Sequence, residues 1–227
     1  MTRNLLTSAI FAGLAAGVLA AALQFVFVIP VLLEGELYES GQRVHFATDG
    51  SPQSDRGAPG IGNDFARHTM TLGFDLVTYT GYGLILMGLM ALGERNGIAI
   101  SARAGLVWGL AGFIAVQLAP ALGQPPDLPG TPAGAVGPRQ AWWAATILCS
   151  AVGLALLAFA RSWLAAIGVV LLALPHLIGA PQLDTYWGVA PPELSAEFAT
   201  LSLGAAAAGW TALGFFCGLF WERARDA

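Results

Sequence analysis

The sequence ALPHLIGAPQ, residues 173–182, places one histidine between two prolines near the end of a hydrophobic run that is long enough to cross a membrane. Intramembrane ionisable groups are costly and are therefore functional-site candidates. Backbone carbonyls that proline leaves without a partner are tolerated in a bilayer only where they face protein or a water-filled cavity. The stretch therefore predicts a polar pathway inside a membrane protein, with Pro175, His176 and Pro181 along one wall.

The composition supports a membrane protein throughout. Hydrophobic residues make up 56% of the chain and charged residues 11%, and the sequence contains no lysine. A helix of about 20 apolar residues spans a bilayer. We predict one integral-membrane domain, residues 1–227, folded as an all-α polytopic helical bundle with six transmembrane helices at about 5–33, 69–93, 104–123, 140–160, 162–183 and 198–221. Only Arg161 separates the fourth and fifth runs, so five spans are the alternative.

The distribution of arginine predicts the orientation. Short segments rich in arginine stay in the cytoplasm, and alternating segments of this chain contain Arg3, Arg95 with Arg103, Arg161, and Arg223 with Arg225. The N-in/C-in orientation follows, with a long outer loop, residues 34–68, between helices 1 and 2. The first apolar run is too long for a typical signal peptide. We expect a multi-pass protein of a bacterial-type inner (plasma) membrane.

The polar residues within the predicted spans that are the main functional candidates are Gln24, Asp75, Gln117 and His176. At about 1.5 Å per helical residue, all four lie in the outer half of the bilayer. His68 and Asp75 are seven residues apart and therefore share a helix face. Gln24, Gln117 and His176 could alternatively only join neighbouring helices by hydrogen bonds.

Asp75 is harder to explain as a packing residue, because a carboxylate in the membrane core costs about 2.5–3.5 kcal/mol on insertion scales. Imidazole and carboxylate groups together suit a divalent transition-metal ion, with Co(II) or Ni(II) favoured over Cu(I) in the absence of thiolates. The predicted metal ligands are His176, His68, Asp75, Glu34 and Glu36, although the two glutamates could simply be solvated. The predicted pathway-lining residues are Gln24, Gln117, Pro120, Pro175 and Pro181.

The three outward-running spans share a proline near the outer end, followed by leucine and glycine. The copies are Pro30-Val-Leu-Leu-Glu-Gly, Pro120-Ala-Leu-Gly and Pro175-His-Leu-Ile-Gly. The pattern is typical of transporters built from repeats with interrupted helices. It could equally reflect the general frequency of proline and glycine at membrane-helix ends.

Several function classes are disfavoured. Cys149 and Cys217 lie in apolar runs, and no cysteine–histidine zinc spacing is present. A net charge of -4 argues against nucleic-acid binding. Without lysine the chain cannot contain the P-loop sequence, so it does not hydrolyse ATP by that means. No hydrolase or zinc-protease motif is present, and we expect neither an enzyme nor a permanently bound cofactor.

Five blocks of sequence are similar to the CbtA family, described as the membrane subunit of a probable cobalt transporter. They are GLVWGLAGFIAVQLAPALGQPPDLPG (residues 105–130), RQAWWAATI (139–147), LPHLIGAPQ (174–182), VIPVLLEGELYE (28–39) and the last span. The resemblance implies cobalt as the transported ion and a small, histidine-rich, single-span CbtB-like partner. A homo-oligomer and contact with membrane lipid are also compatible with it.

We therefore predict the membrane subunit of a cobalt transporter that moves the ion through an outward-facing polar vestibule. The alternatives are a non-transporting scaffold or accessory subunit and a metal exporter. An intramembrane enzyme is the weakest alternative.

Overall fold

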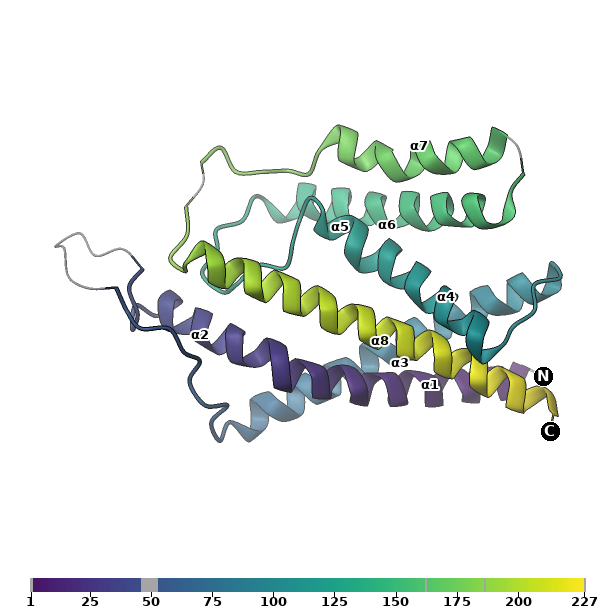
Figure 1. Ribbon diagram of the computed structural model, residues 1–227, viewed down its shortest axis with the longest axis horizontal. Coiled ribbons are helices and arrows are strands. Elements are labelled where there is room, and N and C mark those ends of the chain that lie inside the picture. The colour runs from purple at the N-terminus through teal and green to yellow at the C-terminus, as the bar shows by residue number, and fades with distance from the viewer. Residues whose placement is uncertain (1, 46–52, 162, 186, 227) are drawn as a thin grey trace. The chain divides into compact units, whose positions relative to one another are not determined.

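The computed structural model describes residues 2–45, 53–161, 163–185 and 187–226. The described residues form helices and no strand, which confirms the all-helical membrane-bundle fold class. The helical elements are α1 (Thr2–Leu23), η1 (Gln24–Val28), α2 (Ile29–Glu39), α3 (Phe65–Arg95), α4 (Ala102–Phe113), η2 (Ile114–Leu118), α5 (Ala119–Ala121), α6 (Val136–Phe159), α7 (Trp163–Ile178) and α8 (Pro192–Asp226). Both η elements are π-helical, and each lies within a longer helix (Figure 1).

Five helices of the described chain are long and apolar enough to cross a membrane: Leu5–Glu39, Phe65–Arg95, Ala102–Ala121, Val136–Phe159 and Pro192–Arg225. The remaining predicted span corresponds to α7, an apolar helix of 16 residues. At 1.5 Å per residue α7 is about 24 Å long, which is less than the hydrocarbon thickness of about 30 Å. A sixth crossing would need the non-helical residues after Ile178 as well.

The chain divides into two compact units. Unit 1 comprises Met1–Phe25, Asn63–Phe113 and Gly204–Ala227, and unit 2 comprises Val26–Gly62 and Ile114–Leu203. Two of the unit boundaries fall at the π-helical segments, between residues 25 and 26 within η1 and between residues 113 and 114 at the start of η2.

Close backbone contacts hold unit 1 together. α1 runs antiparallel to α3 (Figure 1), and added Cβ atoms at Gly13 and Gly17 would overlap or crowd the α3 backbone at Thr80 and Asp75. α4 and α8 meet in the same way at Gly105 and Gly214. Small residues at membrane-helix interfaces let backbones approach closely, and van der Waals packing then drives association.

Polar contacts close one end of unit 1. Glu94 Oε1 accepts hydrogen bonds from Trp221 Nε1 at 3.1 Å and from Arg225 Nη1 at 2.8 Å. Glu222 Oε2 accepts a hydrogen bond from the Ala102 backbone N–H at 3.0 Å. Both chain termini lie at this end (Figure 1), which is the arginine-rich end that the sequence predicts to be cytoplasmic.

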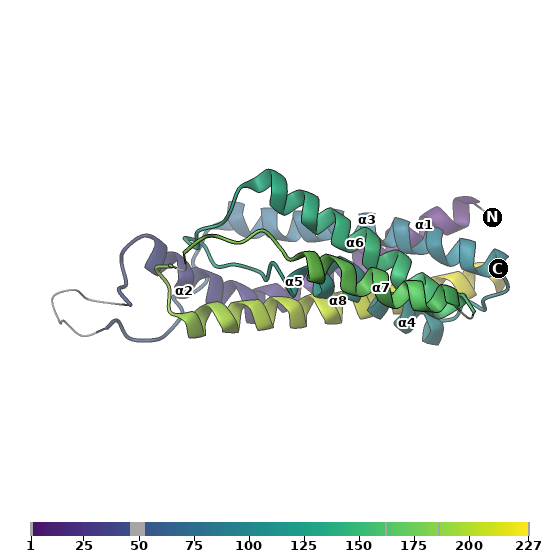
Figure 2. The ribbon, with the colours of Figure 1, turned by 90° about the horizontal axis from the view of Figure 1, so that it is seen from above.

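In unit 2, α6 and α7 run antiparallel and side by side in both views (Figure 1 and Figure 2). The two helix backbones meet closely at Gly153 and Gly168. An added Cβ at either glycine would approach the carbonyl oxygen of the other. The turn between these helices lies next to Arg161, as the sequence predicts.

The first span continues past its predicted end at residue 33, because Glu34 is neutralised within unit 2. Its side chain is buried, and Oε1 accepts hydrogen bonds from Arg43 Nη1 at 2.7 Å and from the Gly57 backbone N–H at 2.8 Å. Arg43 Nη2 also donates to the Gly57 carbonyl at 2.6 Å. Helix α2 therefore reaches Glu39, and the described parts of the outer loop fold back onto it.

We expect Gly214→Ala to destabilise unit 1, because the added methyl group would overlap the α4 backbone. Gly204→Ala is the matched control on the same helix, since an added Cβ there meets no atom within 4 Å. Both changes raise helix propensity by about 1 kcal/mol, whereas overpacking costs about 1–3 kcal/mol. Thermal unfolding in detergent should show a lower Tm for Gly214→Ala only. Equal Tm values would contradict the close α4–α8 contact.

Candidate metal-ion site

A partly buried hydrogen bond joins η1 to α3 in unit 1. Gln24 Nε2 donates to Asp75 Oδ1 at 2.8 Å. Asp75 is 8% exposed, and its second oxygen, Oδ2, has no hydrogen-bond partner among the described residues. Buried polar atoms are nearly always paired, so this unpaired oxygen makes Asp75 a candidate site residue.

The local structure places the two partners. Gln24 is the first residue of η1, six residues before Pro30. Proline lacks the backbone N–H, and its ring crowds the carbonyl four residues earlier. A π-helical turn is one way to accommodate such a break, and such turns often occur at functional sites. On α3, Asp75 lies where Gly17 lets the two helix backbones meet.

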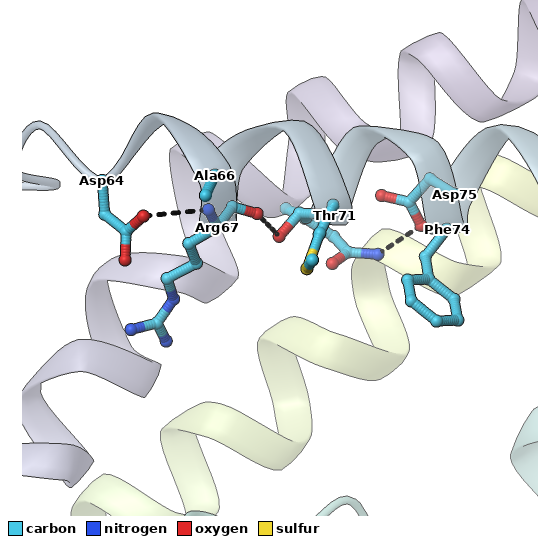
Figure 3. A pocket seen from close by; sticks show the side chains of 8 residues that line it. Asp64, Ala66, Arg67, Thr71, Phe74 and Asp75 are labelled. Atoms are coloured by element: carbon cyan, nitrogen blue, oxygen red, sulfur yellow. Dashed lines mark hydrogen bonds between the residues drawn. The ribbon is translucent and has the colours of Figure 1, made fainter.

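An open depression of about 640 Å³ leads to Asp75. Its other lining residues are Gln24, Asp64, Ala66, Arg67, Met70, Thr71 and Phe74 (Figure 3). Asp64 caps the N-terminus of α3 by accepting a hydrogen bond from the Arg67 backbone N–H at 3.0 Å. The Thr71 hydroxyl donates to the Arg67 carbonyl at 3.1 Å. The depression therefore contains two carboxylates, a guanidinium, an amide and a thioether.

His68 lies on α3 seven residues before Asp75, so the predicted shared face is present in the helix. Its ring packs edge-on against Phe25, with 5.5 Å between ring centroids. His68 does not line the depression. An approach to an ion at Asp75 would need a different side-chain position.

The other predicted ligands and pathway residues belong to unit 2: Glu34, Glu36, Gln117, Pro120, His176, Pro175 and Pro181. Glu34 is engaged by Arg43, and Glu36 is half-buried on α2. No group of three or more His, Cys, Asp or Glu side chains that could hold a metal ion occurs within the described parts of the chain. The predicted five-residue ligand set remains a prediction.

His176 is anchored by a residue that the sequence did not single out as a partner. Trp142 Nε1 donates a buried hydrogen bond to the Pro175 carbonyl at 3.0 Å. The indole ring also packs edge-on against His176, with 6.0 Å between centroids. The tryptophan pair in RQAWWAATI was the available signal, since buried indole N–H groups usually find a partner.

Three of the similar blocks converge at Trp142 in unit 2. An added Cβ at Gly123 would overlap the indole ring, and Gln182 Nε2 donates to the Gly123 carbonyl at 3.1 Å. Gln124 Nε2 bonds the Arg139 carbonyl at 3.3 Å, and Arg139 pairs with Asp127 at 3.3 Å. Residues far apart in the sequence therefore form one connected polar structure.

The π-helical segments bear on the repeat hypothesis. η1 and η2 each contain five residues and a glutamine, Gln24 or Gln117, and each ends two residues before its proline. The two glutamines differ in register, because Gln24 is six residues before Pro30 and Gln117 is three before Pro120, so the repeat hypothesis remains a prediction. Pro175 instead lies inside α7, with no π-helical segment before it.

These features define a multi-pass helical membrane protein with polar groups buried between its helices. The chain belongs to the CbtA family, described as "probable cobalt transporter subunit", whose family model matches residues 2–222. The resemblance seen in the sequence is thereby confirmed. No curated protein and no solved structure matches the chain. The family description makes cobalt the suggested cargo and implies partner subunits.

We expect Trp142→Phe to lower the Tm of the purified protein, because it removes the hydrogen bond to the Pro175 carbonyl. Loss of one such buried bond costs about 1–2 kcal/mol. Trp143→Phe is the control, since the neighbouring indole is 45% exposed. Equal Tm values for the two variants would show that the Trp142–Pro175 bond contributes little.

Proposed function

We propose that this chain forms the ion path of a cobalt transporter and that Asp75 is the intramembrane residue that receives the ion. The buried Oδ2 of Asp75, which has no hydrogen-bond partner in the described chain, carries the proposal. Asp75 lines the open depression described above, through which an incoming ion could approach the residue. Gln24 holds the other oxygen and so orients the carboxylate without neutralising its charge.

The remaining ligands of the ion would come from neutral groups. Carboxylate and imidazole ligands suit Co(II) and Ni(II). His68 is the predicted nitrogen ligand that lies nearest to Asp75 in the sequence, on the same helix α3. Water molecules retained by the ion would supply further ligands. His176, Glu34, Glu36 and Gln117 stay candidate path residues of unit 2, with Pro120, Pro175 and Pro181 beside them.

The energy source in this proposal lies outside the chain. A protein without lysine has no P-loop, so ATP would act only through another subunit. A cation entering a negative interior gains about 2.3 kcal/mol per charge per 100 mV, which favours import of a divalent ion. Uptake and efflux measured in inverted and right-side-out vesicles would separate import from export.

We further propose an N-in/C-in orientation in a bacterial-type inner membrane and a small, histidine-rich, single-span CbtB-like partner. The chain has only three histidines, so capture of dilute cobalt would depend on ligands from elsewhere. Cobalt uptake with and without co-expression of such a partner tests this part of the proposal.

Asp75→Asn should reduce radioactive cobalt uptake at least tenfold. The substitution removes the charge but keeps the shape and an oxygen that can accept from Gln24. Asp184→Asn, which alters an exposed carboxylate in a loop of unit 2, is the matched control and should stay within twofold of the wild type. Uptake per amount of protein in the membrane is the quantity to compare.

A scaffold function has its own specific support, because the Gln24–Asp75 bond also joins two helices. If the bond serves assembly alone, Asp75→Asn should transport cobalt at the wild-type rate, and Gln24→Leu should lower the Tm. That pair of results would reject Asp75 as an ion ligand.

A further inference from the structure

A second surface depression of unit 1 lies between α1 and the end of α8. It has a volume of about 880 Å³ and is remote in sequence from Asp75. Phe11, Leu14 and Val18 of α1 line it, with Phe220 and Arg223 of α8. The α1 residues recur at intervals of three and four and therefore share one face. Phe11 and Val18 are more than half exposed, so no described side chain covers this apolar surface.

The length of this groove suits a lipid chain. Its α1 wall runs from Thr7 to Val18, and the eleven helical steps between these residues correspond to about 16 Å. That distance is about half of the hydrocarbon thickness of about 30 Å. An acyl chain occupies one leaflet, so a groove of this length is suited to a single chain.

The charge at the end of the groove favours an anionic headgroup. Arg223 is exposed and makes no ion pair with any side chain in the described part of the protein. Arg225, two residues later, is instead paired with Glu94. Arg223 lies in the last turns of α8, at the end of unit 1 where both termini lie (Figure 1), so it sits at the headgroup level of that leaflet. Basic pockets between membrane helices are typical binding sites for anionic lipid headgroups.

We infer that the groove between α1 and the end of α8 binds one anionic phospholipid, with its phosphate at Arg223 and an acyl chain along Phe11, Leu14 and Val18. The site does not depend on the identity of the transported ion. It would fix α8 against α1 from the lipid side and make protein stability depend on lipid charge.

Native mass spectrometry of the full chain in detergent tests the inference with two lipids that have the same acyl chains. Phosphatidylglycerol should bind about fivefold more tightly than phosphatidylcholine, as expected for about 1 kcal/mol from one arginine. Arg223→Gln should abolish the difference. Arg103→Gln, another exposed arginine of unit 1 that does not line the groove, should preserve it.

A matched pair of variants tests the apolar wall of the groove. Leu14→Trp would fill the groove and should weaken both lipids, whereas Leu19→Trp should not, since Leu14 and Leu19 are 38% and 39% exposed and only Leu14 lines the groove. Gel filtration checks folding, and Phe11→Ala replaces Leu14→Trp if that variant aggregates. Millimolar phosphate should not displace the lipid.

Three results would overturn the inference. One is equal binding of the two lipids to the wild type. Another is an equal loss of the preference for phosphatidylglycerol in Arg103→Gln and Arg223→Gln. Such a result would attribute the preference to the overall positive charge of the surface and not to Arg223. The third is displacement by phosphate without an effect of the groove variants, which would indicate a site for a free anion.

Discussion

In a bilayer every backbone carbonyl has to find its hydrogen-bond partner within the protein or in a water-filled cavity, and proline makes that requirement acute in this chain. Pro30 and Pro120 each follow a π-helical segment that rearranges the carbonyls before the ring. Pro175 lies in the last turn of α7. Its carbonyl accepts from the Gly179 backbone N–H at 3.0 Å and from the Trp142 indole.

The position of the buried carboxylate depends on how closely α1 packs against α3. Gly17 and Gln24 are seven residues apart on α1 and η1, so they present one face to α3. Gly17 brings the α1 backbone against that of Asp75, and Gln24 then reaches the side chain of the same residue. A bulkier residue at 17 would separate the helices and lengthen that hydrogen bond. Helix packing and site geometry are therefore not independent in unit 1.

The sequence predicted the features that depend on hydropathy and on the free-energy cost of placing a charged residue in the membrane. The apolar runs gave the helices, and the expense of a membrane carboxylate drew attention to Asp75. It missed features that depend on three-dimensional contacts. Glu34 was predicted to be a metal ligand or a solvated charge, but its side chain is buried and accepts hydrogen bonds from Arg43 and the Gly57 backbone N–H. No contact was predicted for Trp142, yet this residue contacts Pro175 and His176. Neither partnership has a fixed sequence spacing that could have predicted it.

The surroundings of Asp75 bear on how strongly an ion could be held there. One hydrogen bond from Gln24 contributes on the order of 1 kcal/mol, which is less than the cost of about 2.5–3.5 kcal/mol for a charge at the centre of the membrane. An arriving cation would supply the difference, so binding is favourable under the proposed function. Arg67 lines the same depression, and its positive charge repels an arriving cation. Transport requires a site that ions both enter and leave, and two carboxylates beside a guanidinium in an open depression would meet that requirement better than a closed shell of several acids.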